Sequence, residues 1–278
     1  MNYSIGCMAK TKIKGKIMID SELQFERANF DQSVYEVIRI IDGIALFLED
    51  HFSRLQQSMK IQGISFEMDF QDFKCNIMEY VEKNQKQNGN IRFLYSKTES
   101  EVEWTFSFIP QSYPNEMDYL NGVTSDLLYA ERQNPNAKVI QTIIREEANL
   151  MIANQKLYEV LLVDQDGLIT EGSRSNVFFV KDNLFYTAPA SKVLVGVTRK
   201  RVIDCLSNLK YMLVEEAVRS SEIGNYDAVF LTGTSPGVLP VRSIGTRIFD
   251  TSHPRIRKLM EQYNDLVSMY IQNEKNIR

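Results

Sequence analysis

The densest series of β-strand signals in this 278-residue chain lies between Tyr158 and Gly233. Four apolar, β-rich segments occur there, separated by turn residues: YEVLLVDQDGLIT, NVFFVKDNLFYTAP, YMLVEEAV and AVFLTG. Runs of this length and composition predict the strands of a sheet. Helical periodicity in TIIREEANLMIANQK, VTRKRVIDCLSNL and PRIRKLMEQYNDLVSMYIQ predicts three helices. The second half of the chain is therefore expected to be a mixed sheet with helices around it.

The first 110 residues predict a compact α+β unit of their own. SVYEVIRIIDGIALF contains two apolar runs joined by a turn at Asp42 and Gly43, and an amphipathic helix follows. FQDFKCNIMEYVEKNQ has the spacing of a second amphipathic helix, and NIRFLYSK and EVEWTFSFIP predict two more strands. The apolar face of the first helix comprises Phe52, Leu55 and Met59, and that of the second comprises Phe70, Phe73, Ile77 and Val81.

The clearest punctuation in the chain is QSYPNEMDYLNG, where Pro110 and Pro114 stand near Asn and Gly. A chain of this length favours two domains over one. We therefore expect a smaller N-terminal α+β domain over residues 1–113, a linker over 114–120 and a larger C-terminal domain over 121–278.

Composition excludes several classes of function. The apolar fraction of 44% and the charged fraction of 24% are typical of globular proteins, and the net charge of -4 argues against a nucleic-acid surface. No apolar run reaches the roughly 18 to 20 residues of a membrane helix, and the lysine-rich N-terminus shows no secretory signal. Cys7, Cys75 and Cys205 are widely spaced, so we expect reduced thiols and a cytoplasmic location. His51 and His253 alone provide too few ligands for a histidine metal site, and no metal is expected.

Three features suggest a site for a phosphate. Thr198 is a natural N-cap for the helix over VTRKRVIDCLSNL, and the N-terminus of a helix attracts anions. The run from Thr232 to Gly237 places hydroxyls and glycines at the end of a buried strand. Arg54 could hold a phosphate with two hydrogen bonds. Together with Glu171, a carboxylate in the polar gap of DGLITEGSRSNVFFV, they suggest a phosphate-bearing cofactor with a ring to be tuned.

At this point a family resemblance becomes specific. The chain from Tyr158 to Val241 resembles the class IV, or fold-type IV, pyridoxal-phosphate aminotransferases, a group that includes branched-chain and D-amino acid aminotransferases and aminodeoxychorismate lyases. Its pattern is E-G-x-x-S-N-(V/I/L)-F, then G-(I/V)-T-R, then (T/S)-G-T. The matching residues are Glu171, Gly172, Ser175, Asn176 and Phe178, then Gly196, Val197, Thr198 and Arg199, then Thr232, Gly233 and Thr234.

The resemblance also implies a lysine that forms a Schiff base with the cofactor. Lys138, in AERQNPNAKVIQT, lies 33 residues before Glu171, which is the interval that the family shows. The other lysine in the interval, Lys156, lies only 15 residues before Glu171 at the end of a predicted helix and is expected to be exposed. Lys138 is therefore the residue that we expect to bond to pyridoxal 5'-phosphate and to act as the general base.

The other implied roles follow residue by residue. Glu171 would face the pyridine nitrogen of the cofactor and favour its protonated form. The residues expected to hold the phosphate are Arg54, Val197, Thr198 and Thr234, with Ser235 as a further candidate, and Ser175 and Asn176 complete the cofactor-binding set. Tyr35 matches an aromatic residue near cofactor and substrate, and Arg174 could meet a substrate carboxylate. The implied architecture has a smaller N-terminal α+β domain and a larger C-terminal mixed-sheet pseudobarrel, and the family forms homodimers.

The residues leave the substrate open. Gln141 and Thr142 stand where the family often has asparagine, YSKTES replaces an Arg-Gly pair, and FDQSVYEV lacks the usual Gly-Asp-Gly. We expect transamination of a small amino acid, either a branched-chain L-amino acid or a D-amino acid, with a 2-oxo acid. One alternative is the aminodeoxychorismate lyase reaction, which eliminates pyruvate to give 4-aminobenzoate, and another is a non-catalytic relative that binds a phosphorylated metabolite.

Overall fold

A computed structural model describes residues 15–16, 32–97, 102–110, 113–132, 135–139 and 142–277. The chain forms two compact units. The first unit comprises Met1–Gln111, Ala137–Ile140 and Tyr270–Arg278, and the second comprises Ser112–Asn136 and Gln141–Met269. The segment predicted as a linker contains helix α3 (Glu116–Asn121), and the domain boundaries given above stay a prediction.

The first unit contains a sheet in the order β1-β5-β4-β2-β3. Its strands are β1 (Gly15–Lys16), β2 (Gln32–Ile41), β3 (Ile44–Ala45), β4 (Gly89–Lys97) and β5 (Val102–Ile109). All neighbours are antiparallel except β1 and β5, which are parallel. Burial alternates along β2, so that Val34, Glu36, Ile38 and Ile40 face the core. A glutamate therefore lies within an otherwise apolar stripe.

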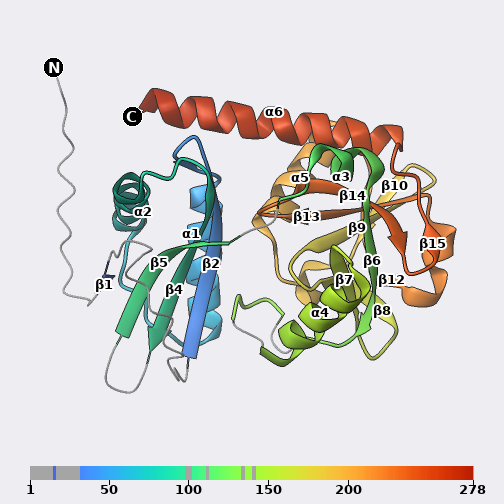
Figure 1. Ribbon diagram of the computed structural model, residues 1–278, viewed down its shortest axis with the longest axis horizontal. Helices are drawn as coiled ribbons and strands as arrows, with labels where there is room; N and C mark the ends of the chain where they lie inside the picture. The colour runs from blue at the N-terminus through green and yellow to red at the C-terminus, as the bar shows by residue number, and fades with distance from the viewer. Residues whose placement is uncertain are drawn as a thin grey trace. The chain divides into compact units, whose positions relative to one another are not determined.

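Two amphipathic helices pack against this sheet (Figure 1). They are α1 (Leu48–Ile61) and α2 (Phe70–Asn84), and the side chain of Asp69 caps α2 by accepting a hydrogen bond from the backbone N–H of Asp72. The predicted apolar faces are confirmed: all their members are buried except Phe70, which is partly buried against the same core. Phe73 lies at the centre, with its ring centroid 5.1 Å from that of Phe93 in an edge-to-face contact.

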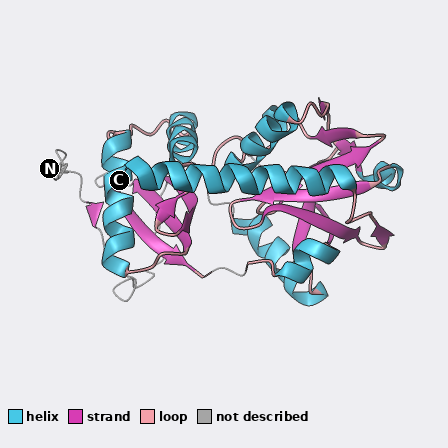
Figure 2. Cartoon of the chain, turned by 90° about the horizontal axis from the view of Figure 1, so that it is seen from above, coloured by secondary structure: helices cyan, strands magenta, loops and turns pink. Residues whose placement is uncertain are grey.

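The second unit is built on one sheet of ten described strands, coloured magenta with the other strands in Figure 2. Their order is β11 (Leu213–Glu215), β10 (Leu184–Thr187), β9 (Asn176–Lys181), β13 (Ala228–Gly233), β14 (Gly237–Ile244), β6 (Val123–Tyr129), β7 (Glu159–Val163), β8 (Leu168–Gly172) and β12 (Val218–Arg219), with β15 (Arg247–Ile248) paired to β14. The two ends of this order, β11 and β12, are separated in the chain only by Glu216 and Ala217. The sheet therefore curls so that its two edge strands approach one another.

The central strands of this sheet are buried along their whole length. Every residue of β7 is buried, and so is every residue of β9 except Lys181. Such continuous apolar runs are typical of strands covered on both faces. Phe178 of β9 stands opposite Phe230 of β13, and their rings stack with centroids 4.9 Å apart.

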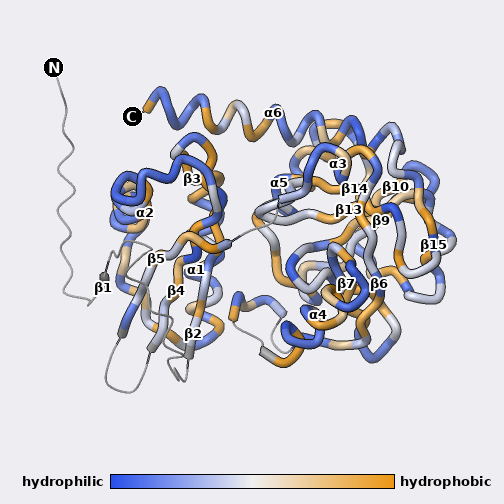
Figure 3. Tube along the Cα trace, viewed as in Figure 1, coloured by the Kyte–Doolittle hydropathy of each residue, from blue (hydrophilic) through white to orange (hydrophobic). Residues whose placement is uncertain are grey.

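Helices α4 (Thr142–Gln155), α5 (Val197–Asn208) and α6 (Pro254–Ile277) match the three predicted from periodicity, and short 3-10 turns occur at Ala190–Lys192 and Ser220–Asn225. Figure 3 shows hydrophilic and hydrophobic residues alternating along α6. Its buried side chains, Ile256, Leu259 and Tyr263, follow a spacing of three and four. Among the described residues, no helix combines the length and the apolar character needed to cross a membrane.

One central strand, β14, was not predicted. A proline inside a strand removes a backbone donor, and Pro240 lies in the middle of this segment. In the structure Pro240 stands opposite Phe230 of the antiparallel neighbour β13, and pairing with the parallel neighbour β6 begins only at Val241. The proline thus precedes the part of the strand that is hydrogen-bonded on both sides.

The thiols also differ from expectation. Cys205 is a free, buried thiol, and burial raises its pKa to about 11. Cys75 is disulfide-bonded. The expectation that the cysteines would all be reduced is therefore wrong for Cys75, and Cys7 lies outside the described residues.

Candidate active site

Lys138 belongs to the first unit, although the segment directly before it in the chain, Ser112–Asn136, belongs to the second. Its backbone is anchored on two elements: its carbonyl accepts a hydrogen bond from the N–H of Tyr35 on β2 at 3.2 Å, and its N–H donates to Oγ of Ser58 on α1 at 3.1 Å. Val139 forms an antiparallel bridge with Val34. The main chain thereby fixes where the Lys138 side chain begins.

The amine of Lys138 lies over an aromatic ring. Its Nζ is 4.8 Å from the ring centroid of Tyr35, and both side chains are half-buried. An ammonium over a tyrosine face is stabilised by the ring quadrupole, by about 0.5 to 1 kcal/mol at accessible sites. The structure thus brings together the predicted lysine and the predicted aromatic residue.

Arg54, expected to bind a phosphate, makes a two-point ion pair in the first unit. Its Nε and one terminal nitrogen donate to the two carboxylate oxygens of Glu36 at 2.8 and 2.6 Å. His51, one helical turn before Arg54 on α1, places Nδ1 2.8 Å from the same carboxylate. Glu36 is fully buried, and the side chain of Arg54 is only 11% exposed.

Charge and burial act on this cluster in opposite directions. Burial alone would raise the pKa of Glu36, but the charge and hydrogen bonds of Arg54, with a smaller contribution from His51, lower it to about 2. Burial lowers the pKa of His51, and the charges of Arg54 and Lys138 add to that effect while Glu36 opposes it. The cluster therefore combines a carboxylate, a guanidinium and a neutral imidazole.

The depressed pKa of Glu36 predicts a loss of stability in acid. Since the folded-state pKa lies below the ordinary value of 4.5, the stabilisation is complete above pH 4.5 and is lost as the pH falls towards 2. The shift corresponds to a free energy on the order of 3 kcal/mol. Urea unfolding of the native chain should show this decline between pH 5 and pH 2. The variant Glu36→Gln should lose less stability over the same range, and equal losses in the two proteins would contradict the assignment.

Glu171, at the end of β8 in the second unit, is 3% exposed. Its Oε2 accepts hydrogen bonds from the backbone N–H of Leu194 at 3.2 Å and from Nδ2 of Asn176 at 3.4 Å. Its Oε1 lies 3.3 Å from Nε of Arg132, whose terminal nitrogen donates to the carbonyl of Ser173. The carboxylate is therefore held by an ion pair and by contacts from two further segments.

The small polar residues after Glu171 surround a second buried carboxylate, that of Glu159. Ser173 Oγ donates to it at 2.6 Å, Ser175 Oγ at 2.8 Å and the backbone N–H of Arg174 at 3.1 Å. A Cβ on Gly172 would collide with Oγ of Ser175 and lie 3.0 Å from the Glu159 carboxylate. This turn is tight because a buried acid organises it, and Ser175 lies in that scaffold.

Helix α5 begins differently from the prediction. Gly196 occupies the N-cap position and no side chain caps the helix, so the expectation that Thr198 is the N-cap is wrong. Thr198 lies inside the first turn and shares a hydrogen bond with Tyr263, a contact that lowers the pKa of the tyrosine while burial raises it to about 12. The first turn still presents backbone N–H groups at Val197 and Thr198 without a side-chain cap, which is the arrangement that binds anions.

Asn176 connects these parts of the second unit. Its Nδ2 donates to the carbonyl of Leu194 at 2.9 Å as well as to Glu171, and its Oδ1 lies where a Cβ on Gly196 would be. On the neighbouring strand it stands opposite Thr232, whose buried hydroxyl has no hydrogen-bond partner within the part of the chain that the structure describes. Glu171, the start of α5 and the end of β13 therefore lie at one edge of this sheet.

The remaining candidates occupy two places. Thr234 and Ser235 lie in the turn from β13 to β14, directly after Thr232 and Gly233. Arg174 is exposed and its guanidinium donates to the side chain of Asn149. The structure thus groups Glu171, Asn176, Val197, Thr198, Thr234 and Ser235 in the second unit, with Arg174 on the outside of the turn.

Crowding around Gly196 gives a stability prediction. Its backbone angles (φ −66°, ψ 139°) suit any residue, so Gly196→Ala is disfavoured only by the collision with Asn176. We expect the substitution to lower the free energy of unfolding by about 1 to 3 kcal/mol. The matched control is Gly224→Ala, where the new Cβ would meet the movable end of the Arg247 side chain. Equal urea midpoints for the two variants would contradict this explanation.

These groups fit a phosphorylated ring cofactor. A buried carboxylate fixed by Arg132 suits a basic ring nitrogen, and an uncapped helix start beside a buried, unpaired Thr232 hydroxyl suits a phosphate. Within the described ranges, no group of three or more His, Cys, Asp or Glu residues is placed to hold a metal ion.

The sequence did not identify Arg132, Glu36, His51 or Glu159 as parts of the site. A signal existed for two of them, since a glutamate inside an apolar strand and a histidine three residues before an arginine on a helix indicate a buried ion pair. Arg132 and Glu159 reach their partners only through the pairing of β6, β7 and β8.

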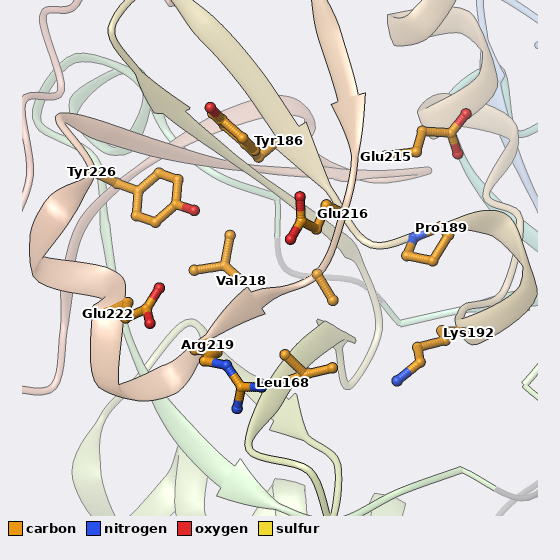
Figure 4. A pocket seen from close by; sticks show the side chains of 11 residues that line it. Leu168, Tyr186, Pro189, Lys192, Glu215, Glu216, Val218, Arg219, Glu222 and Tyr226 are labelled. Carbon is orange, nitrogen blue, oxygen red and sulfur yellow. The ribbon is translucent and has the colours of Figure 1, made fainter.

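A cavity of about 370 Å³ opens at the seam of the curled sheet, beside β12 (Figure 4). Its wall includes Tyr186, Tyr226, Glu216, Glu222 and Arg219. None of the residues predicted for the site lines it, so the residues of the family motif and this cavity are separate features of the second unit.

Comparison with known proteins agrees with this arrangement. The family described as amino-transferase class IV matches residues 33–244. A D-alanine aminotransferase of Bacillus licheniformis is 29% identical over 264 residues, covering 88% of this chain and 92% of that protein.

Solved structures show the same fold. A putative 4-amino-4-deoxychorismate lyase from Legionella pneumophila superposes with a TM-score of 0.80 at 23% identity, over 90% of this chain and 98% of that one. A branched-chain amino acid aminotransferase of T.th., solved with pyridoxamine 5'-phosphate, gives a TM-score of 0.78 at 23% identity, over 95% and 92%. The predicted mixed α/β architecture of fold type IV is confirmed, and the chain belongs to the class IV aminotransferase family.

Proposed function

We propose that this chain is a pyridoxal-phosphate-dependent aminotransferase that transfers an amino group between a small amino acid and a 2-oxo acid. The observation that carries the proposal is the buried Glu171 carboxylate, which pairs with Arg132 and stands at the glutamate of the family motif. Membership of the class IV family and the similarity to a D-alanine aminotransferase support the reaction type.

The two central residues have separate tasks. When bound, pyridoxal phosphate supplies an aldehyde and an electron-withdrawing ring that stabilises negative charge at the substrate α-carbon. Nζ of Lys138 would hold the aldehyde covalently and, once released, take up and return the proton of the α-carbon. Glu171 would keep a proton at the ring nitrogen, because a nearby carboxylate favours the protonated form.

The remaining groups would bind and orient. Arg54, the N–H groups of Val197 and Thr198, and the hydroxyls of Thr234 and Ser235 would hold the phosphate. Asn176 would keep Glu171 in place through its hydrogen bond, with Ser175 fixing the adjoining turn. Tyr35 would face the cofactor and substrate next to Lys138, and Arg174 would be a candidate for the substrate carboxylate.

A direct assay tests the reaction. L- and D-amino acids should be supplied in turn with 2-oxoglutarate or pyruvate, and formation of the new amino acid should be measured. The proposal expects transfer that depends on both partners. Pyruvate release from aminodeoxychorismate without transfer would instead identify the lyase reaction. A purified chain that gains no visible absorption band with pyridoxal phosphate would identify a non-catalytic relative.

We infer that the enzyme acts as a homodimer in the cytoplasm, as the family resemblance implies. Sedimentation equilibrium of the purified chain should give twice its monomer mass. A monomer at the concentrations of the activity assay would overturn the dimer, and recovery of the enzyme outside the cytoplasmic fraction would overturn the location.

A further inference from the structure

We propose that Glu36 is a positioning residue that holds the guanidinium of Arg54 in the orientation required for the cofactor phosphate, with His51 fixing the carboxylate. The inference rests on the proposed function, because it assigns a partner to the residue that would bind the phosphate. It concerns only the first unit, where all three residues lie.

The position of Glu36 needs an explanation beyond stability. It lies on the core-facing side of β2 between Val34 and Ile38, opposite Phe93 on β4, and is fully buried. Taking a carboxylate and a guanidinium out of water costs so much that apolar residues of similar volume often serve stability equally well or better. A buried pair in an apolar stripe is therefore better explained by what it positions.

The geometry fixes the guanidinium rather than merely neutralising it. Contacts of 2.8 and 2.6 Å from Nε and a terminal nitrogen to the two carboxylate oxygens determine the plane of the Arg54 group. His51 Nδ1, 2.8 Å from Oε2, fixes the carboxylate from a second direction. The guanidinium then needs no reordering when an anion arrives, and such preorganisation increases affinity.

The cluster is also coupled to Lys138. The charge of Lys138 acts on His51, and Ser58 on the same helix accepts a hydrogen bond from the Lys138 backbone. Helix α1 thus carries Arg54, His51 and the anchor of the lysine. A shift of α1 would move the arginine and the lysine segment together.

The test compares two ligands that differ only in the phosphate. Affinities for pyridoxal phosphate and for pyridoxal should be measured by absorbance titration in the native chain, Glu36→Gln, Arg54→Met and the double variant. Both ligands can bond to Lys138, so their ratio isolates the phosphate. We expect Glu36→Gln to weaken pyridoxal phosphate binding by a factor on the order of 10 to 100, with little change for pyridoxal.

The double variant separates positioning from a general structural role. If Glu36 acts through Arg54, the change Glu36→Gln should have little further effect once Arg54 is methionine. Equal weakening of both ligands, or an undiminished effect in the Arg54→Met background, would overturn the proposal. Should Glu36→Gln not fold, Glu36→Asp keeps the charge but shortens the side chain, and a native ligand ratio in that variant would also overturn it. If the native chain binds neither ligand, the proposed function fails instead.

Discussion

Lys138→Ala is expected to lower the transamination rate by a factor on the order of 10³ or more, because the side chain supplies both the covalent attachment and the general base. The fold should survive the change, since the contacts that anchor this segment come from the backbone of Lys138, and alanine keeps them. The contact between Nζ and the Tyr35 ring is lost, and its contribution at a half-buried position is small. Steady-state kinetics with saturating cofactor, together with thermal unfolding, would measure both effects.

Lys156→Ala is the matched control, because Lys156 is exposed at the end of α4 and should leave the rate unchanged. Borohydride reduction of the cofactor-loaded enzyme followed by peptide mapping should place the label on Lys138 in the native chain and nowhere in Lys138→Ala. Partial recovery of that variant by a small added amine would show that the missing group is a base. A labelled Lys156, or a Lys138→Ala variant with the native rate, would remove the central assignment.

Sequence alone predicted the elements whose apolar patterns are local. The buried strands β7 and β9 and the amphipathic helices α1 and α2 each carry their signal within one short segment. The start of α5 was displaced by two residues because Thr198 satisfies the composition of an N-cap, whereas the backbone places Gly196 there. Strand β14 was missed because Pro240 contradicts a central strand unless its neighbours are known.

The candidate site shows the same division. The motif residues could be named from spacing, but their partners could not. The serines of the EGSRSN turn donate to Glu159, and Glu171 pairs with Arg132, through contacts that depend on how distant strands align. Glu36 illustrates the opposite case, because its place in an apolar strand was visible in the sequence while its partners on α1 came from the fold. Sequence identifies the residue types that chemistry requires, and the fold decides which of them meet.

Glu171→Gln is expected to lower the turnover number by a factor on the order of 10² to 10³, the size of loss that follows removal of one preorganised electrostatic partner. The amide has nearly the same shape and can still accept from the Leu194 N–H, but it carries no charge to favour a protonated ring nitrogen. Since Lys138 is untouched, the variant should still be labelled by borohydride. This combination of retained attachment and lost turnover separates Glu171 from the lysine.

The ion pair with Arg132 adds a second effect that must be distinguished from the first. Replacing Glu171 by glutamine leaves a largely buried guanidinium opposite a neutral group, which should lower the free energy of unfolding by about 3 kcal/mol. Kinetics should therefore be measured well below the unfolding midpoint of the variant. Glu216→Gln, at an exposed acid of the same unit, is the control and should change neither quantity. If Glu171→Gln were destabilised yet turned over at the native rate, Glu171 would be a structural partner of Arg132 only, and the ring-nitrogen role would have to be abandoned.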